Sequence, residues 1–533
     1  MKKTLVLFVF YLAVFHLYAQ KTPLNAEIQL ENSADDYFLI PVGSDGLIVF
    51  YMEGETNNGN REWYFIKYST QFKEVWTKKE TMKYSMEFVK FDLNKNSKKL
   101  YLLFSSVAST ALSKGKEYNL MMLDTDKGKI EIYTGVSPLS FLINDFAVIG
   151  DKAFIGGISY YNFWQSCMIS MCLGYIDMLT VTPTIPHKAM LVYMNIDDQS
   201  TQPVPYTFKG ESTITDFSVP ESREYLDIVV RNTGKTTATY LDRYDKKGNN
   251  IYSLELEAKE SRINVLTAKV ADVAANKKII IGTYDKYATN SYLDAFANGI
   301  YFATADDKGI IDFNLYSFTE LKNFFKYMSK KKQDKLDKKI SKAKSKGKEY
   351  DVNYKLLVHD PVIYEDQYII IGEAYYPEYE QRCRTTYVNG QAQTTCHTVF
   401  VGYRFTHAFI AAFNSRGKMI WDNTFEIQNI LTFDLSYKVK EMFLDKDVVL
   451  VYNFSGLLQS KIIREGKVIE GKKSTKITTN YKESDIKAMG GSGTEYWYDN
   501  YFLAYGYIKV KDKAKTSGKK SRYVFYFNKI EFE

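Results

Sequence analysis

The sequence feature that most constrains the fold is a short frame that recurs along the chain as strand, tight turn, strand. It is clearest in residues 413–421, where Asn414 opens the turn, Gly417 follows three residues later and Trp421 four residues after that. The same frame recurs in residues 68–76, 244–252 and 305–313, with Phe72 in the glycine position of the first of these copies. An Asn or Asp that bonds its own backbone and a Gly with positive φ are typical of tight hairpin turns. We expect the aromatic residue of each copy to pack between sheets.

A second frame lies upstream of the first, as an apolar strand that ends in Gly and is followed closely by Tyr. Its copies lie in residues 154–160, 279–284, 369–375 and 502–507. Units of four short strands at a period of roughly 50–70 residues are the signature of propeller blades. The strands before each turn indicate eight units, with seven as the alternative count and two smaller β-domains as the competing architecture. The last unit lacks a fourth strand, and we expect residues 26–30 to supply it and leave no open edge.

The Gly-x-x-x-Trp ending of the first frame, at Gly417 and Trp421, resembles the repeats of quinoprotein-type and WD40-like propellers. The mature chain also resembles a family of uncharacterised secreted β-propellers common in Bacteroidota, through residues 401–408 and 496–502. The resemblance implies an all-β, single β-propeller architecture. It implies no function, and the ligands of a quinone cofactor are not recognisable in this chain.

The N-terminus reads as a signal peptide over residues 1–19. Lys2 and Lys3 precede a short apolar run, and a small residue, Ala19, stands at the expected cleavage point, with Gln20 as the alternative. A membrane anchor would need roughly 20 apolar residues, and no second segment is long enough to span a bilayer. We therefore expect an exported protein, periplasmic, outer-membrane-associated or secreted, whose residues 20–533 form the propeller.

The long insertions of the sequence are expected to project from one face. In a blade whose strands run from the centre outward, the loops between the second and third strands emerge on the same face as the connections to the next blade. The long segments fall in these two classes of loop and cover residues 158–187, 283–297, 319–350, 376–402 and 508–520. Long loops on a rigid scaffold carry function in many proteins, so this face is the candidate binding face.

Residues 319–350 form a predicted helical insertion. Ser317 and Glu320 fit a capping box, and apolar residues follow at helical spacing before and after a break near Ser329; they are Leu321, Phe324, Phe325, Met328, Leu336, Ile340 and Ala343. This pattern predicts a helical hairpin packed on the propeller with a solvated basic side. Its lysines, among them Lys330, Lys331, Lys332, Lys338 and Lys339, are the candidate surface for an acidic partner, lipopolysaccharide phosphate or anionic lipid.

The 376–402 insertion carries a predicted disulfide. Asn389-Gly390 is a strong signal for a two-residue hairpin turn, and counting back from it places Cys383 opposite Cys396. Cysteines opposite each other in a non-hydrogen-bonded pair are close enough to bridge. Beside this hairpin, Tyr375, Tyr376 and Tyr379 are candidate binding residues. A second cysteine pair, Cys167 and Cys172, lies in an apolar insertion that we interpret as a packed loop, with an apolar docking patch as the alternative.

No catalytic motif, metal-ligand cluster or cofactor loop stands out in the sequence. The mature chain has four histidines, His187, His359, His397 and His407, and none is spaced as a metal pair. For His359 and Asp360, at the start of an inner strand, we expect a structural hydrogen bond. A formal net charge of +7 is too mild and dispersed to indicate nucleic acid.

The sequence therefore predicts a non-enzymatic binding or scaffold protein of the cell envelope that docks a protein partner. The alternative is a carbohydrate-binding protein or carbohydrate-active enzyme that uses the same face. Two facing carboxylates in a central cleft would favour hydrolysis, whereas a protruding apolar and basic face would favour protein docking.

Overall fold

The computed structural model describes most of residues 20–533. The residues outside the description are 1–19, 31–35, 56–58, 107–116, 138–140, 161–186, 205–209, 234–236, 258–262, 275, 288–295, 389–390, 429 and 512–520. Cys167 and Cys172, and most of the segments 158–187, 283–297 and 508–520, therefore lie outside the described residues.

The described residues form eight antiparallel sheets. The first four contain β2 (Tyr37–Pro41), β3 (Leu47–Glu55), β4 (Asn60–Tyr68) and β5 (Glu74–Lys83); β6 (Met86–Asn94), β7 (Lys99–Ser106), β8 (Glu117–Asp124) and β9 (Ile130–Val136); β10 (Phe141–Ile149), β11 (Lys152–Tyr160), β12 (His187–Asn195) and β13 (Thr201–Pro203); and β14 (Ser212–Ser218), β15 (Tyr225–Asn232), β16 (Ala238–Asp245) and β17 (Asn250–Glu255).

The other four sheets follow the same plan. They contain β18 (Asn264–Ala274), β19 (Lys277–Asp285), β20 (Gly299–Asp306) and β21 (Gly309–Ser317); β22 (Lys355–Val358), β23 (Val362–Tyr364), β24 (Gln367–Val388), β25 (Gln391–Phe413), β26 (Met419–Glu426) and β27 (Leu431–Thr432); β28 (Lys440–Leu444), β29 (Asp447–Phe454), β30 (Leu457–Arg464) and β31 (Lys467–Lys476); and β32 (Ile486–Tyr498), β33 (Tyr501–Lys511), β34 (Ser521–Phe532) and β1 (Gln20–Gln29). Short 3-10 turns lie at Gly43–Asp45 (η1), Phe324–Tyr327 (η3) and Glu483–Asp485 (η4).

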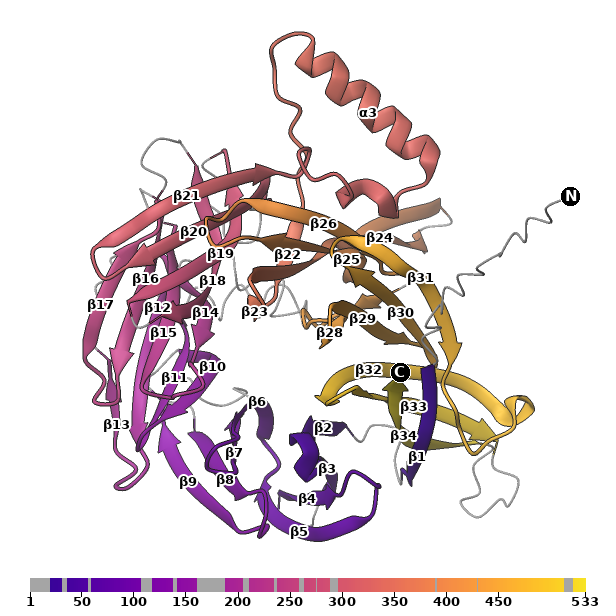
Figure 1. The fold of residues 1–533 in the computed structure, drawn as a ribbon. Coiled ribbons are helices and arrows are strands. Elements are labelled where there is room, and N and C mark those ends of the chain that lie inside the picture. Colours follow the sequence, from indigo (N-terminus) through magenta and orange to yellow (C-terminus); the bar gives the residue numbers. More distant parts are fainter. Residues whose placement is uncertain are drawn as a thin grey trace, which may run out of the picture.

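The sheets are arranged around a central hollow, with the first strand of each sheet nearest the centre (Figure 1). In six of the sheets the four strands follow one another in sequence and pair antiparallel as an up-and-down meander; the sheet of β24 adds the short strands β23 and β27, and the last sheet takes β1 as its fourth strand. Sequential four-stranded meanders around a common axis are the architecture of a β-propeller. The all-β propeller prediction is therefore confirmed.

The last sheet is completed by the N-terminal strand. β1 pairs with β34 from Gln20 opposite Phe532 to Gln29 opposite Val524. The prediction that the N-terminus supplies the missing fourth strand is confirmed, although the strand begins at Gln20 and is longer than the predicted 26–30. A strand from each end of the chain thus closes the ring and covers the edge of β34.

The hydrophobic core is divided into clusters that each join two consecutive sheets. Among the described residues, eight such clusters follow one another around the ring. The one between the last sheet and the first packs Trp497 and Phe525 against Leu39 and Leu47. Since every sheet buries both of its faces against neighbours, stability depends on closing the whole ring.

The repeated turns link neighbouring sheets as well as strands. In the turn at Asn414, the side-chain oxygen accepts from the backbone N–H groups of Arg416 and Lys418. Gly417 has φ 71° and its backbone approaches so closely that a Cβ would lie 2.5 Å from the ring of Phe302 in the preceding sheet. Phe72, in the equivalent position, adopts φ 56° and stacks on Trp497 at 5.8 Å. The predicted aromatic residues Trp76 and Trp421 pack against Gly128 and Gly466 of the following sheets, where a Cβ would lie 2.9 Å and 2.6 Å from their side chains, so the expected packing between sheets is present.

The connection between β21 and β22 departs from the predicted helical hairpin. Glu320 does accept from the backbone N–H of Ser317, as in a capping box, but only the 3-10 turn η3 follows. Asp422 of β26 accepts from the N–H groups of Lys322 and Asn323, and Phe324 is fully buried in the core. These tertiary contacts replace an α-helix in the first half of the insertion. The second half forms α3 (Lys330–Lys344).

Candidate functional site

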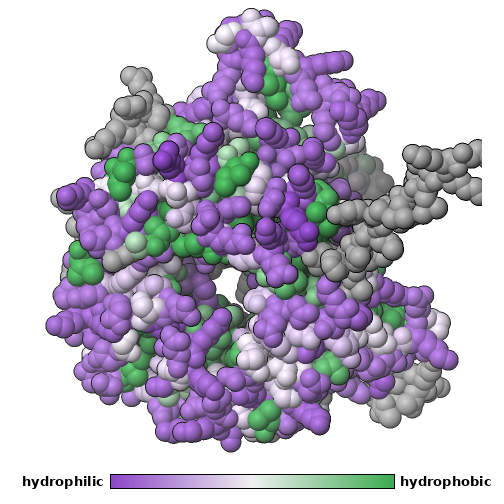
Figure 2. All heavy atoms as spheres, viewed as in Figure 1, coloured by the Kyte–Doolittle hydropathy of each residue, from purple (hydrophilic) through white to green (hydrophobic). Residues whose placement is uncertain are grey.

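Charged side chains on the innermost strands form ion pairs between neighbouring sheets, around the opening that Figure 2 shows at the centre of the ring. The pairs are Lys90–Asp145 at 2.6 Å between β6 and β10, Asp216–Lys269 at 2.5 Å between β14 and β18, and Lys440–Glu495 at 2.8 Å between β28 and β32. Their partners lie on different sheets, so these pairs bind the inner strands to one another.

Three of these charged residues occur in the same local sequence pattern, and none of them is among the candidate residues predicted from the sequence. Lys90, Asp145 and Asp216 each follow a β-bulge in the innermost strand. Each is preceded by an apolar residue two positions earlier and followed directly by Phe. A β-bulge re-aims a side chain, and this recurring pattern of apolar, any, charged, Phe was the signal that could have located the inner ring of charges.

Lys269 contacts two carboxylates, one buried and one exposed. Its Nζ is 2.5 Å from Asp216 and 2.8 Å from Asp360, and the side chain of Asp216 is only 7% exposed. Burial alone would lower the pKa of Lys269, but the two carboxylates outweigh it and hold the pKa well above its usual range. Burial raises the pKa of Asp216. At Asp360 burial acts in the same direction, but the positive charge of Lys269 outweighs it and lowers the pKa.

The two carboxylates of this group differ in pKa, as the acid and base of a hydrolase do. Both of them, however, contact the same ammonium group, which occupies the space between them. A pair of carboxylates that hydrolyses a glycosidic bond must face the substrate and its water. The arrangement therefore serves to hold strands β14 and β18 and the loop after β22 together.

His359 forms the expected structural hydrogen bond. Its Nε2 is 2.9 Å from Glu373 and its Nδ1 is 3.5 Å from Glu441. Burial opposes the charged imidazole, but the hydrogen bonds and charges of the two carboxylates raise the pKa of His359 to about 9. Glu373 also accepts from the backbone N–H groups of Lys438 and Val439. The group fixes the 435–439 segment against β24.

A cavity of about 420 Å³ opens beside this segment, between the sheets of β14, β18 and β24. Aromatic side chains form much of its wall: Tyr354, Tyr375, Tyr379, Phe400, Tyr403 and Tyr437. Arg231, Lys269 and Lys355 are its charged residues, and none of the described residues that line it is Asp or Glu. Lys269 is already paired with Asp216 and Asp360, so it is the aromatic walls of the cavity that favour a ligand, one with an apolar group.

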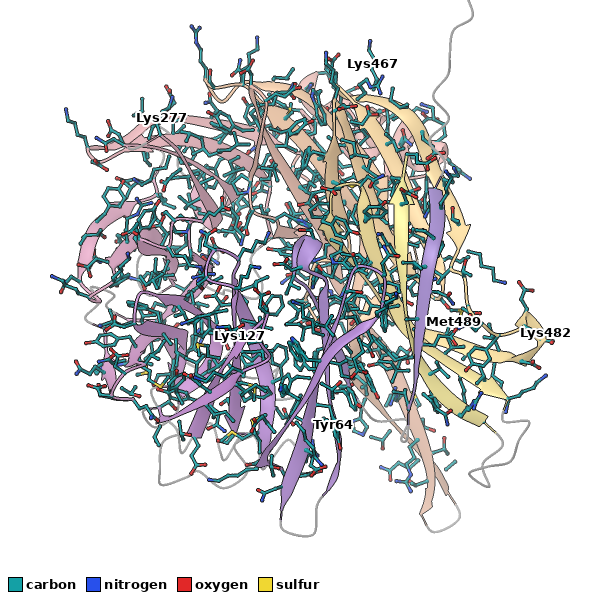
Figure 3. All side chains as sticks on the ribbon, turned by 60° about the horizontal axis from the view of Figure 1, so that its bottom comes forward. Tyr64, Lys127, Lys277, Lys467, Lys482 and Met489 are labelled. Atoms are coloured by element: carbon teal, nitrogen blue, oxygen red, sulfur yellow. A yellow bond between two sulfur atoms is a disulfide. The ribbon has the colours of Figure 1, made fainter. Side chains whose placement is uncertain are left out.

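The long β24–β25 hairpin forms one side of the cavity and extends well beyond its sheet, toward the same side of the ring as the β3–β4 hairpin that carries Tyr64 (Figure 3). The turns with Lys277 and Lys467 lie on the opposite side. Tyr375 and Tyr379 line the cavity, and Tyr379 is 57% exposed. Tyr376, which is 43% exposed, does not line it. Two of the three candidate tyrosines thus meet at the cavity.

The predicted disulfide between Cys383 and Cys396 is confirmed. The two residues are opposite each other in the hairpin, with Cα atoms 4.0 Å apart. The turn residues Asn389 and Gly390 lie outside the described residues, but Val388 pairs with Gln391 as the turn requires. The hairpin that borders the cavity is thereby cross-linked beyond the edge of the sheet.

Replacing both cysteines with serine should loosen this hairpin without unfolding the ring. The chain-entropy model assigns about 3 kcal/mol to closing a loop of this length when the loop stays ordered in the folded state. Residues 381–386 are exposed, so the reduced hairpin can open locally while the core stays folded, and the global cost is avoided. We expect faster proteolysis between residues 383 and 396 and an unchanged midpoint of global unfolding. Cleavage at the wild-type rate, or a large drop in the midpoint, would contradict this local role.

The candidate lysines lie away from the cavity. Lys330, Lys331, Lys332, Lys338 and Lys339 are all on α3, which stands beyond the rim of the ring (Figure 1). None of them lines the cavity. The structure therefore does not bring the lysines and the tyrosines into one site, because η3 is held over β26 by Asp422 and directs α3 outward.

His407 is a buried neutral histidine. Its side chain is stacked on Tyr327 at 3.8 Å, and its Nε2 has no hydrogen-bond partner among the described residues. Burial lowers the pKa of His407 to about 3. The pKa of His407 is lower in the folded state than its unfolded value of about 6.5. Its contribution to the unfolding free energy is therefore fully present above pH 6.5 and is lost as the pH falls toward 3.

Replacing His407 with Phe should remove this acid sensitivity. Between pH 6.5 and 4.5 the wild type should lose about 2 kcal/mol more unfolding free energy than the variant. Denaturant titrations of both proteins at the two pH values measure this difference. Equal losses would show that His407 becomes protonated in the folded state at no cost.

Among the described residues, no group of three or more His, Cys, Asp or Glu side chains is placed to hold a metal ion. The described part of the chain also contains no helix of the length and apolar character needed to cross a bilayer.

No protein-family model matches the chain, and no curated protein matches its sequence. Among solved structures, it is similar to Sqt1 from Saccharomyces cerevisiae, with a TM-score of 0.38 at 9% identity over 92% of this chain and 97% of that one. It is also similar to the β-propeller domain of the Trilobed protease from Pyrococcus furiosus, with a TM-score of 0.34 at 7% identity over 83% and 93% of the two chains.

A third similar structure is a Synechocystis apocarotenoid oxygenase mutant, with a TM-score of 0.33 at 10% identity over 52% of this chain. That match spans 61% of the length of the oxygenase chain. Similarities of this size carry no function from one protein to another. The propeller architecture of this chain rests on its own strand order and closed ring of sheets.

Proposed function

We propose that this chain is an eight-bladed propeller that acts as a non-enzymatic binding protein of the cell envelope and docks a protein partner at the cavity beside the β24–β25 hairpin. Eight successive sheets and eight clusters between them support the blade number. The predicted signal peptide and the disulfide support an oxidising compartment outside the cytoplasm.

The observation that carries the proposal is a continuous run of aromatic contacts from the cavity to the exposed surface. Inside the cavity, Tyr375 packs edge-on against Tyr403 at 5.6 Å. Tyr403 contacts Phe400 at 5.0 Å, and Phe400 contacts Phe433 at 5.9 Å. Phe433 is 59% exposed. Large exposed aromatic residues beside a pocket are typical of protein-docking surfaces.

We name this surface the aromatic patch and define it as Tyr379, Phe400, Tyr403, Phe433, Leu435 and Tyr437. Leu435 and Tyr437 are 38% and 36% exposed, and their segment is anchored through Glu373. This end of the patch is therefore positioned before binding, which reduces the entropy lost in an interface. A partner would place an apolar side chain in the cavity, against its aromatic wall.

Replacing Phe433 with Asp tests the proposal. The change puts a charge at the exposed end of the aromatic patch, and we expect it to weaken partner binding at least about tenfold. Ile311→Asp is the matched control, because Ile311 is 55% exposed on the outer strand β21. Quantitative co-purification from native envelopes should show loss of one partner with Phe433→Asp alone. Equal recovery with both variants would refute the site.

A glycan is the second candidate ligand, because five of the six aromatic residues of the cavity wall are tyrosines. Tyrosine rings stack on sugar faces, and their hydroxyls exchange hydrogen bonds with sugar hydroxyls. Calorimetric titration with envelope oligosaccharides separates the two candidates. Saturable binding that Tyr379→Ala abolishes would replace the protein partner with a glycan.

A further inference from the structure

We infer that α3 is an electrostatic docking element for an anionic lipid surface. This inference is independent of the cavity, since α3 lies on another part of the molecule. It concerns the fifteen residues Lys330–Lys344, which include eight lysines and two aspartates.

The helix is held at both ends, and none of its own residues is buried among the described residues. Before it, Phe324 is buried in the core and Asn323 donates to Asp422. After it, Lys286 of the segment following β19 contacts Asp351 at 2.9 Å. The helix itself has no buried residue and stands beyond the ring (Figure 1). A fixed position outside the ring leaves α3 accessible to a large flat surface.

Four of the eight lysines share the outward side of the helix. Leu336, Ile340 and Ala343 are the half-buried apolar residues of α3 and mark the side nearest the rest of the molecule. At 3.6 residues per turn, the positions 331, 335, 338 and 342 fall together on the other side, and all four lysines are exposed. They form a basic face.

This arrangement weakens the helix when it is alone. Lys331–Lys335 and Lys338–Lys342 are like-charge pairs at a spacing of four residues, which destabilise a helix. Asp334 offsets part of this repulsion: it is four residues from both Lys330 and Lys338, and its contact with Lys330 is 3.1 Å. A helix of this length with no buried face is marginal in water. A negatively charged surface would relieve the repulsion along the basic face.

The chemistry of the face favours lipid over a protein groove. Binding in a protein groove uses apolar anchors at helical spacing, and here the apolar side is turned inward. The basic residues are all lysines, which act as point charges and do not offer the bidentate geometry of arginine. Clusters of lysines attract anionic lipid headgroups additively, without specific geometry.

The test measures binding of the full mature chain to vesicles of phosphatidylcholine that carry about one third phosphatidylglycerol, at low salt. The variant is Lys331→Glu, Lys335→Glu, Lys338→Glu and Lys342→Glu combined. Because α3 has no buried residue, the ring should remain folded. We expect vesicle binding by the wild type, a loss of about 100-fold or more in the variant, and loss of wild-type binding at high salt.

The control carries the same change of charge on the tight turns, as Lys73→Glu, Lys127→Glu, Lys247→Glu and Lys467→Glu, all exposed lysines. It should bind vesicles nearly as well as the wild type. Equal losses in both variants would assign the effect to net charge and overturn the inference. Absence of wild-type binding to these vesicles would overturn it as well, including the case in which the basic face binds an acidic protein instead.

Discussion

A variant that lacks residues 20–30 should lose about 4–8 kcal/mol of unfolding free energy, because it removes a whole strand from the ring. β1 contributes eight residue pairs with β34. Leu30 is buried, and Ala26 and Ile28 pack in the cluster that joins the last sheet to the first. The deletion also exposes the edge of β34, which invites association between molecules. Denaturant titration and light scattering measure both effects.

The control for this deletion restores the strand at the other end of the chain. Gln20 pairs with Phe532, so residues 20–30 joined to Phe532 through a two-residue Asn-Gly turn that replaces Glu533 can re-form the same antiparallel pair in the same register. The rearranged protein should recover most of the lost stability. If the deletion left the unfolding transition unchanged, the closure of the ring would not stabilise the fold.

Replacing Lys269 with Met should lower the unfolding free energy by about 3–5 kcal/mol, because it leaves Asp216 buried without a counter-ion. Asp216 is 7% exposed and depends on Lys269 for its salt bridge. Lys246→Met is the matched control, since its partner Glu224 is 63% exposed and Lys246 is 44% exposed. That exposed pair should contribute less than about 1 kcal/mol.

The loss at Lys269 should depend on pH. Burial already raises the pKa of Asp216 above that of an unfolded aspartate, and removal of Lys269 should raise it further. A folded pKa above the unfolded pKa favours the folded state at low pH, so the gap between variant and wild type should narrow as the pH falls. Adding Asp216→Asn should also recover stability at neutral pH. A gap that stayed constant with pH would contradict the assignment of the loss to a buried carboxylate.

The features that sequence predicted correctly are local or periodic. The Asn389-Gly390 sequence predicted the register in which Cys383 lies opposite Cys396. The repeated turns and the missing fourth strand predicted that the N-terminus would close the last sheet. Turn residues act over a few positions, and the number of strands is a property of the whole chain. Both can be predicted from the sequence without knowing which sheets are in contact.

The candidate site could not be assembled in this way. Lys90 and Asp145 are separated by 55 residues and meet only because their strands are neighbours in the ring. The helical spacing around Phe324 predicted a helical hairpin. Asp422, about 100 residues further along the chain, instead accepts from the backbone N–H groups of Lys322 and Asn323, and no α-helix forms there. The cavity likewise combines residues from several sheets, so its lining depends on tertiary packing that no single segment encodes.

The most direct test of the account is photo-crosslinking in native envelopes, with a photoreactive phenylalanine analogue placed at Phe433, Tyr379 or Ile311 in separate proteins. Phe433 and Tyr379 belong to the aromatic patch, whereas Ile311 is equally exposed on the outer strand β21. We expect the same partner protein to be captured from positions 433 and 379 and not from 311. Capture from position 311 alone, or no capture from the aromatic patch, would contradict the proposal that this surface docks a protein.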